Sequence, residues 1–256
     1  MTTDLIALTI EEGVAILTLN RPEKLNAITP DMAAAIEEHC AKVDRDDSVR
    51  VLLVKGAGER AFCAGSDLNA LAEYPSSWKF RNRVEYATAV RDVRKPVVAA
   101  LKGWVLGGGC EIALSADIRV AGASARCGFP EVKRGWVGGG GASQMLPRLI
   151  GYGQAMRLLL TGEAIDAEEA LRLGLVELLV ADAEVDARAL ALCRQIASYS
   201  PVAVEAVKAS VRMALIAPLD GGLRYENEMN TLCFAAGDHL EGIRAFQQDR
   251  PAQFKR

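Results

Sequence analysis

The sequence is short of the residues on which several common enzyme mechanisms depend. It contains two histidines in 256 residues, His39 and His239, which lie far apart along the chain. No serine lies in a G-x-S-x-G motif, so a hydrolase built on a nucleophile elbow is not indicated. Isolated histidines also do not form the ligand clusters of catalytic zinc sites. We therefore set aside serine hydrolysis and metal catalysis, and predict no metal ligands.

Paired cysteines, an excess of basic residues and long apolar runs are absent as well. The six cysteines contain no C-x-x-C pair, which favours reduced thiols over disulfides or a zinc site. The formal net charge of −3 argues against a general nucleic-acid partner. No apolar stretch is long enough to cross a bilayer, and the first residues, MTTDLIALTIEEG, do not resemble a signal peptide. We expect a cytoplasmic protein without a nucleic-acid or membrane partner.

The apolar patterns predict strands in the first part of the chain and helices in the second. Leu5–Ile10 and Val14–Leu19 read as a hairpin, and Val49–Lys55 and Pro96–Leu101 as buried strands. A helix is expected from Thr29-Pro30 to about Asp46, with Thr29 as its N-cap. From Gly151 onward only helices are predicted, at 152–160, 166–173, 184–199, 201–216, 221–235 and 239–248. This order predicts an α/β core at 1–195 and a helical region at 196–256.

The segment from Trp104 to Arg134 holds the most unusual local chemistry. Gly107–Gly109 leads into CEIALSA, which suits a short buried helix. The patterns G-x-G-x-x-G and G-x-x-x-x-G-K-[ST] are absent, so these glycines do not indicate a nucleotide site. Glu111 is the only charged residue between Lys102 and Asp117. Burial of a carboxylate is costly and raises its pKa, which makes Glu111 a candidate functional residue.

Two junctions of small residues, AGSD at 64–67 and GGGCE at 107–111, each end a predicted strand and begin a helix. Backbone N–H groups at such junctions point outward without obstruction, and two of them converging on one oxygen form an oxyanion hole. Ordinary tight turns explain the same residues, so both interpretations stay open. Glu131, behind Pro130 in the first turn of another predicted helix, either complements the helix dipole or pairs with Glu111 for acid–base chemistry.

Several motifs in a fixed order resemble those of the crotonase, or enoyl-CoA hydratase/isomerase, superfamily. They cover nearly the whole chain and read NRPEKLNA (20–27), AFCAGSDL (61–68), KPVVAALKGWVLGGGCEIALSADI (95–118), FPEVKRG (129–135) and LTGEAIDAEEALRLGLV (160–176), with EGIRAFQQDRPAQFK at the end. The resemblance implies an α/β fold, a crotonase-like spiral of repeated ββα units with a helical C-terminal trimerisation region. It also implies a homotrimer or dimer of trimers.

The resemblance assigns roles to individual positions. It implies Glu111 and Glu131 as catalytic residues and the backbone N–H groups of Ser66 and Gly108 as the oxyanion hole, with the Ser66 hydroxyl incidental. It places acyl-CoA binding at Lys24, Leu25, Ala27, Ala64, Gly65, Asp67, Leu68, Gly107, Pro130, Gly139, Phe254 and Lys255. Phe254 and Lys255 match positions that reach the adenine-ribose site, often in a neighbouring subunit, although a solvated basic tail also explains Lys255.

One loop departs from the family pattern. Family hydratases usually carry a Pro-Gly-Ala-Gly-Gly type of loop, whereas residues 138–142 read GGGGA. Without proline the loop is less restricted, which bears on substrate preference more than on reaction type. Trp136 and Trp104 are interpreted as pocket walls or as core residues, and segment 69–88 falls where the family's acyl-pocket loop varies most.

The reaction that the resemblance implies is the reversible syn addition of water to a 2-trans-enoyl-CoA, giving a 3-hydroxyacyl-CoA. Retention of both glutamates favours this hydratase over a Δ3–Δ2 enoyl-CoA isomerase or another crotonase-type enzyme such as a thioester hydrolase. The alternative that is not an enzyme is a non-catalytic CoA-binding or RNA-binding member of the superfamily. No cofactor is expected, because coenzyme A enters as part of the substrate.

Overall fold

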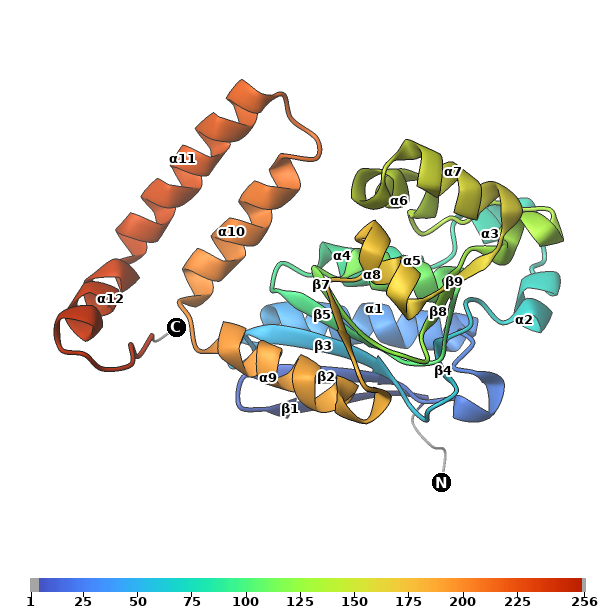
Figure 1. Ribbon diagram of the computed structural model, residues 1–256, viewed down its shortest axis with the longest axis horizontal. Coiled ribbons are helices and arrows are strands. Elements are labelled where there is room, and N and C mark those ends of the chain that lie inside the picture. Colours follow the sequence, from blue (N-terminus) through green and yellow to red (C-terminus); the bar gives the residue numbers. More distant parts are fainter. Residues whose placement is uncertain (1–4, 255–256) are drawn as a thin grey trace.

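The computed structural model describes residues 5–254 and contains two sheets covered by helices (Figure 1). The larger sheet has the strand order β1-β2-β3-β5-β7-β10, and the smaller has β4-β6-β8-β9. The strands of the larger sheet are β1 (Ile6–Glu11), β2 (Val14–Leu19), β3 (Val51–Gly56), β5 (Val97–Leu101), β7 (Ile118–Gly122) and β10 (Leu178–Val180). Those of the smaller sheet are β4 (Ala61–Cys63), β6 (Trp104–Leu106), β8 (Arg126–Gly128) and β9 (Ala164–Asp166).

The helices follow the strands in a repeated pattern. The α-helices of the core are α1 (Pro30–Arg45), α2 (Leu68–Ala72), α3 (Ser77–Arg81), α4 (Tyr86–Asp92), α5 (Gly108–Ser115), α6 (Ala142–Ile150), α7 (Tyr152–Thr161), α8 (Ala167–Leu173) and α9 (Val185–Ala197). Three short 3₁₀ helices are η1 (Pro22–Lys24), η2 (Pro130–Arg134) and η3 (Asp182–Glu184). The C-terminal helices are α10 (Pro201–Met213), α11 (Leu219–Ala236) and α12 (Asp238–Gln247).

Three successive strand pairs, β3–β4, β5–β6 and β7–β8, form the spiral. The first strand of each pair joins the larger sheet and the second joins the smaller sheet, and both sets run parallel. Helices return the chain to the next pair, as a parallel connection requires. The expected spiral of ββα units is therefore confirmed.

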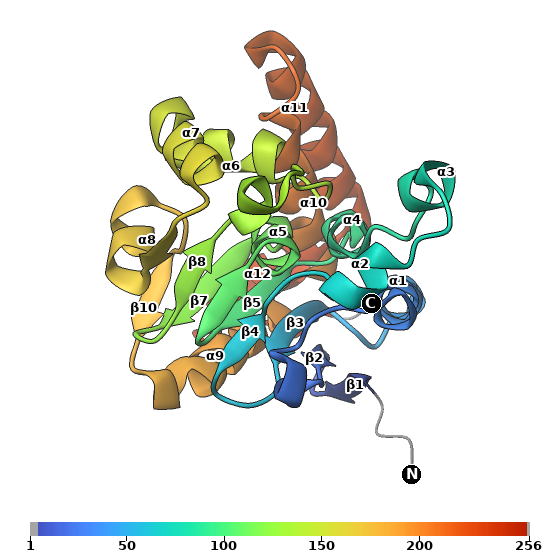
Figure 2. The same cartoon turned by 90° about the vertical axis from the view of Figure 1, so that its right-hand side faces the viewer.

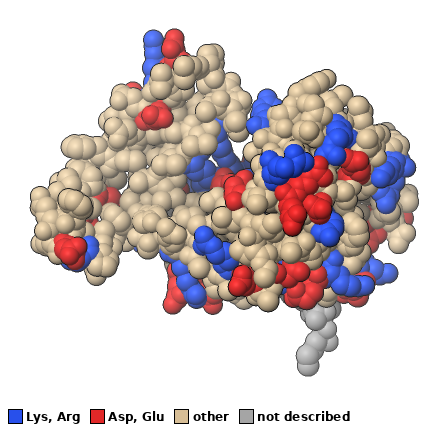
Figure 3. Space-filling view, viewed as in Figure 1, with Lys and Arg blue, Asp and Glu red and all other residues tan. Residues whose placement is uncertain are grey.

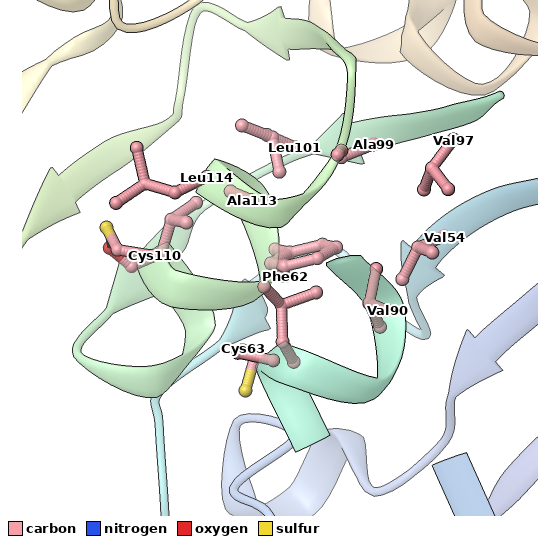
Figure 4. Close-up of a cluster of buried hydrophobic side chains, with 14 of the residues drawn as sticks. Val54, Phe62, Cys63, Val90, Val97, Ala99, Leu101, Cys110, Ala113 and Leu114 are labelled. Atoms are coloured by element: carbon pink, nitrogen blue, oxygen red, sulfur yellow. Dashed lines mark hydrogen bonds between the residues drawn. The ribbon is translucent and has the colours of Figure 1, made fainter. Parts of the chain in front are cut away.

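The central strands of the larger sheet are buried on both faces because helices cover both of them (Figure 2). All five residues of β5 are buried, which explains why VVAAL is an uninterrupted apolar run. Apolar residues of β3 and β5 pack against α9 on one face, and α1, α4 and α5 close the main core on the other. In that core, Phe62 of β4 lies between Ala113 of α5 and Val90 of α4 (Figure 4).

Several local predictions are confirmed by the structure. The hairpin pairs β1 with β2 in antiparallel register, from Ile6↔Leu19 to Glu11↔Val14. Helix α1 begins at Pro30, and the Thr29 hydroxyl accepts a hydrogen bond from the Met32 N–H at 3.3 Å. The buried helix expected after the three glycines is α5, every residue of which is buried.

The structure corrects one prediction of local structure and refines another. The chain after Gly151 is not purely helical, because β9 pairs with β8 and β10 pairs with β7. Both strands have three residues and their stability comes from the neighbouring strand, which leaves little local signal. The segment behind Pro130 is a 3₁₀ helix of five residues that ends at Gly135, whose φ of 84° lies in the left-handed region.

Helices α10–α12 extend away from the sheets (Figure 1). Lys208 of α10 anchors this region to the core, where its ammonium lies 2.6 Å from the Asp117 carboxylate and donates to the Lys95 carbonyl. Helix α11 has no buried residue, and the extension shows few charges on the face seen in Figure 3. The boundary predicted at 195–200 falls between α9 and α10, and the independence of the two regions stays a prediction. No helix within residues 5–254 is long and apolar enough to cross a membrane.

Candidate active site

The AGSD and GGGCE junctions meet at one edge of the smaller sheet. They follow β4 and β6, which are neighbouring parallel strands, so both carboxyl ends lie side by side. A Cβ built on Gly65 would stand 3.1 Å from the Gly108 nitrogen and 3.0 Å from the Leu106 carbonyl oxygen. Gly65 also has a φ of 90°, so any side chain here would be strained as well as crowded. Glycine is thus required for the two junctions to approach each other.

The loop NRPEKLNA binds the AGSD junction through Asp67 and the backbone. The Arg21 guanidinium donates to the Asp67 carboxylate at 2.7 Å and to the Ala27 carbonyl at 3.0 Å. Asp67 also caps α2, and its hydrogen bond from Arg21 is the largest cause that lowers its pKa. The Ile28 N–H donates to the Gly65 carbonyl at 2.8 Å. These bonds explain why the two motifs occur together.

Asn26 fixes the same loop from within the core. Its side chain is fully buried, and its amide donates to the carbonyl oxygens of Ala61 and Phe62 in β4 at 2.9 and 3.2 Å. Leu25 and Asn26 have φ values of 54° and 55°, a conformation that asparagine tolerates better than most residues. The buried amide therefore holds a strained turn against the strand that leads to AGSD.

Glu111 is the buried carboxylate that the sequence indicated, with 4% of its surface exposed. Its Oε1 accepts the N–H groups of Gly140 at 2.8 Å and Ala142 at 3.1 Å. Burial is the largest effect on its pKa and raises it from 4.5 to about 7, although both hydrogen bonds oppose the rise. Both of these donors bind the same oxygen, Oε1.

Glu131 reaches the same place from η2. A Cβ built on Gly107, whose φ is 54°, would stand 2.9 Å from the Glu131 Oε1, so this carboxylate lies against the start of α5. Burial raises the pKa of Glu131, while its own backbone N–H and the Arg134 charge oppose that rise. The negative charge of Glu131 also contributes to the raised pKa of Glu111, after burial. The two carboxylates are therefore close enough to interact.

One cavity of about 820 Å³ contains these groups. The site residues expected from the sequence that line it are Lys24, Leu25, Ala27, Ala64, Gly65, Ser66, Asp67, Leu68, Gly107, Gly108, Glu111, Pro130, Glu131 and Gly139. Phe254 does not line the cavity, and its carbonyl accepts a hydrogen bond from Arg50 at 2.9 Å. Lys255 lies outside the described residues.

The cavity also contains residues that sequence reasoning missed. One of them is Tyr86 at the start of α4, whose hydroxyl lies 2.9 Å from the Ser66 hydroxyl. It is buried against Gly108, where an added Cβ would overlap the tyrosine oxygen at 1.8 Å. Phe80, Arg83 and Glu85 line the cavity nearby. Their segment was identified as variable, but no local pattern indicated which side chains turn inward.

One of the two tryptophans fits an interpretation made from the sequence, and the other fits neither. Trp136 lines the cavity, as a pocket wall would. Trp104 is neither wall nor core, because it lies outside the cavity and is 42% exposed on β6. The alternation of side chains along the three-residue strand β6, in which Val105 is buried and Trp104 is exposed, accounts for this correction.

The four-glycine loop packs directly on Glu111. A Cβ on Gly138 would stand 2.6 Å from Oε1 of that carboxylate, and one on Gly140 would stand 2.8 Å from Oε2. The Gly140 carbonyl accepts from the Arg91 guanidinium at 3.3 Å. Arg91 is held in turn by Thr88, whose hydroxyl accepts at 2.9 Å. The loop is thus fixed by hydrogen bonds on both sides in the absence of proline.

The cavity shows no metal-binding arrangement. Within residues 5–254 no group of three or more His, Cys, Asp or Glu side chains is placed to hold a metal ion. The polar groups that face the cavity are instead carboxylates, a hydroxyl pair, basic side chains and backbone N–H groups. Such a set suits proton transfer next to a stabilised oxyanion.

Comparison with known proteins agrees with this arrangement. The family model for enoyl-CoA hydratase/isomerase matches residues 9–256, so the chain belongs to that family. A short-chain-enoyl-CoA hydratase from Clostridium acetobutylicum is 38% identical over 245 residues, covering 94% of this chain and 93% of the relative. A crotonyl-CoA hydratase from Syntrophomonas wolfei is 36% identical over 253 residues, covering 97% of each.

Solved structures give the same assignment of fold. The crystal structure of an enoyl-CoA hydratase from Bacillus anthracis superposes with a TM-score of 0.92 at 32% identity, covering 98% of this chain and 99% of that one. A second crystal structure, of an enoyl-CoA hydratase subunit from Geobacillus kaustophilus, superposes with a TM-score of 0.92 at 37% identity, covering 98% of this chain and 97% of that one. The resemblance drawn from the ordered motifs is therefore confirmed, as is the crotonase fold.

Proposed function

We propose that this protein is an enoyl-CoA hydratase that adds water reversibly, in syn geometry, to a 2-trans-enoyl-CoA. The observation that carries the proposal is the single cavity in which two buried or half-buried glutamates lie beside two glycine-rich junctions. Full-length relatives named short-chain-enoyl-CoA and crotonyl-CoA hydratase support the same reaction. The product is a 3-hydroxyacyl-CoA.

The backbone N–H groups of Ser66 and Gly108 serve as the oxyanion hole in this proposal. The support is the close approach of Gly65 to the Gly108 nitrogen, which places the two junctions side by side. Negative charge develops on the thioester oxygen when water attacks the β-carbon, and donors fixed in advance stabilise it most effectively. The Ser66 hydroxyl is engaged with Tyr86 and needs no part in bond formation.

The two glutamates divide the proton transfers. Glu111 takes a proton from water as the oxygen bonds to the β-carbon, and Glu131 gives a proton to the α-carbon. Dehydration reverses both transfers. A pKa of about 7 suits Glu111 to this exchange, because near neutral pH the group is available in both protonation states. Water attack and proton delivery on one face of the double bond give the syn outcome.

The coenzyme A part of the substrate is proposed to lie along the NRPEKLNA and AGSD motifs. Lys24, Leu25 and Leu68 line the cavity there, and the Lys24 ammonium is suited to a phosphate. Phe254 and Lys255 are assigned to the adenine end of a neighbouring subunit's substrate. Phe254 lies away from the cavity of its own chain, which is consistent with a contact across subunits. No resident cofactor enters this scheme.

A homotrimer or a dimer of trimers is the proposed assembly, formed through the C-terminal helices. Large apolar side chains are exposed along α10–α12 at Val207, Val211, Leu215, Leu223, Leu232, Phe234, Leu240, Ile243 and Phe246. Phe246 alone is 88% exposed. So many exposed apolar side chains in three successive helices are expected to be covered by another chain. The cytoplasmic location expected from the sequence stays a prediction.

The test of the reaction compares Glu111→Gln and Glu131→Gln with the wild type. Each substitution keeps the size of the side chain but removes its proton transfer, so kcat is expected to fall about 10²-fold or more. Binding of a saturated acyl-CoA, measured by calorimetry, is expected to change little. Glu38→Gln, on the exposed side of α1, is the matched control.

The assay follows the loss of enoyl absorbance with crotonyl-CoA and, separately, double-bond migration in a 3-enoyl-CoA. Hydration at the wild-type rate in either glutamine variant contradicts the mechanism. Migration without hydration in the wild type instead supports an isomerase.

A further inference from the structure

An ion pair lies in the wall of the cavity next to the four-glycine loop. Arg83 and Glu85 stand in the connection between α3 and α4, and their side chains approach to 2.9 Å. Both line the cavity, and their side chains are only 21% and 22% exposed. The proposed reaction assigns neither of them a role.

The pair is held in place by Phe80 on one side and Gly139 on the other. Arg83 donates to the Phe80 carbonyl at 2.9 Å, and its guanidinium lies 4.1 Å from the centre of the Phe80 ring. On the far side, a Cβ built on Gly139 would stand 2.7 Å from the Arg83 Nη2 and 3.6 Å from the Glu85 Oε2. Glycine at 139 therefore provides the room that the ion pair occupies. These contacts make the pair a fixed part of the wall.

The four-glycine loop places this wall next to Glu111. Gly138 and Gly140 touch the Glu111 carboxylate, and Gly139 between them touches the ion pair. Glu85 is near enough that its charge adds to the raised pKa of Glu111, after burial and one backbone hydrogen bond. The motifs assigned to coenzyme A lie on other elements, η1 and α2. An acyl chain that continues past the β-carbon therefore meets the wall formed by Phe80, Arg83 and Glu85.

Charged groups in this wall are unfavourable neighbours for a long alkyl chain. An alkyl chain that covers the pair would remove its remaining water and offer no hydrogen bond in return. The Arg83 charge is already balanced by Glu85, and Glu111 and Glu131 lie close by, so a chain ending in a carboxylate gains little here. A short chain leaves the pair hydrated and still fills the space beside Phe80.

We propose that the Arg83–Glu85 ion pair limits the length of the acyl chain and makes the enzyme selective for short 2-enoyl-CoA substrates such as crotonyl-CoA. This proposal rests on the hydratase function and adds the class of substrate to it. The four-glycine loop has a defined part in it, because glycine at 139 lets the ion pair reach the wall.

The test measures kcat/KM for crotonyl-CoA and for 2-decenoyl-CoA and compares their ratio between variants. In the double variant Arg83→Met/Glu85→Leu, apolar side chains of similar length replace the pair. The ratio of decenoyl to crotonyl activity is expected to rise about tenfold or more, since several added methylenes gain apolar contacts. Arg83→Met alone leaves the Glu85 charge in place and is expected to give no such gain.

The matched control is Arg81→Met. Arg81 belongs to the same segment but lies outside the cavity, where it packs over the Trp78 ring at 5.7 Å. The ratio of the two activities is expected to stay within about twofold of the wild-type ratio in this variant. A comparable rise in the control would mean that loosening of the segment, and not loss of the ion pair, admits the longer chain.

Three results overturn the proposal. They are an unchanged ratio in an active double variant, a wild-type preference for 2-decenoyl-CoA over crotonyl-CoA, and a wild-type preference for an enoyl-CoA that ends in a carboxylate. The last two need no variant to fold. The affinities for butyryl-CoA and decanoyl-CoA, measured by calorimetry, test the length preference independently of the hydratase reaction. A wild type that binds butyryl-CoA more tightly but hydrates no enoyl-CoA contradicts the hydratase function and leaves the length preference intact.

Discussion

Replacing Glu111 by glutamine is expected to stabilise the folded protein at pH 8, although the same change removes activity. Burial raises the pKa of Glu111 from 4.5 to about 7. The folded chain therefore binds a proton at this carboxyl more tightly than the unfolded chain does. Well below pH 4.5 the carboxyl group is protonated in both the folded and the unfolded chain, so its raised pKa does not reduce the free energy of unfolding. As the pH rises toward 7 the unfolded chain releases its proton first, so stability is lost.

The size of this loss follows from the shift of pKa. Each unit corresponds to about 1.4 kcal/mol, so the burial of Glu111 costs about 3 kcal/mol at pH 8. At pH 5 the same relation gives about 1 kcal/mol. Glutamine can still accept the N–H groups of Gly140 and Ala142 through its carbonyl oxygen. The stability gained by Glu111→Gln is therefore expected to increase by about 2 kcal/mol between pH 5 and pH 8.

Denaturant unfolding at pH 5, 6, 7 and 8 measures this difference. All samples are kept at one protein concentration, because the proposed subunit association would make stability depend on concentration. Any effect of the amide that does not depend on pH cancels when the gain at pH 5 is subtracted from the gain at pH 8. Glu38→Gln is the control, because Glu38 is an exposed residue of α1 and such substitutions change stability by no more than about 0.5 kcal/mol. A gain in Glu111→Gln that is equal at pH 5 and pH 8, or that shrinks as the pH rises, refutes the reasoning.

Three further predictions concern the supports of the site and the assembly. Arg91→Leu removes the donor to the Gly140 carbonyl and is expected to lower kcat about tenfold with little change in KM. Arg91→Lys is expected to recover part of the lost activity. A wild-type kcat in Arg91→Leu would mean that the four-glycine loop keeps its shape without the Arg91 guanidinium. Gly108→Ala places a Cβ 1.8 Å from the Tyr86 oxygen. We therefore expect kcat to fall about 10²-fold and the melting temperature to be lower. Full activity in this variant would contradict the close packing of α5 against Tyr86. Phe246→Asp, at a side chain 88% exposed, is expected to lower the mass measured by analytical ultracentrifugation, and an unchanged mass would exclude this face from the subunit interface.

The regular elements were predictable because their signals are local. The apolar run of β5, the Thr29-Pro30 start of α1 and the turn between β1 and β2 each depend on a few adjacent residues. The strands β9 and β10 were not predicted, because three residues carry too little pattern and the pairing partner supplies the stability. The 3₁₀ form of η2 likewise depends on the αL conformation that ends it at Gly135.

The sequence by itself determined the list of reactive groups. It singled out Glu111 because a lone charge in an apolar segment is costly to bury, and it indicated the AGSD and GGGCE junctions because small residues expose the backbone. Ser66 and Gly108 within those junctions were named by the family resemblance. The ordered motifs added the family. None of these signals depends on distance between segments, so they could be read along the chain.

Only the tertiary structure decided whether those groups meet. The parallel pairing of β4 with β6 brings Gly65 against Gly108, and the fold of the four-glycine loop brings two N–H groups onto Glu111. The inward direction of Arg83 and Glu85 depends on contacts with Phe80 and Gly139, the latter more than fifty positions later in the chain. Such proximity is set by the packing of distant segments, and for that reason no local pattern in the sequence contains it.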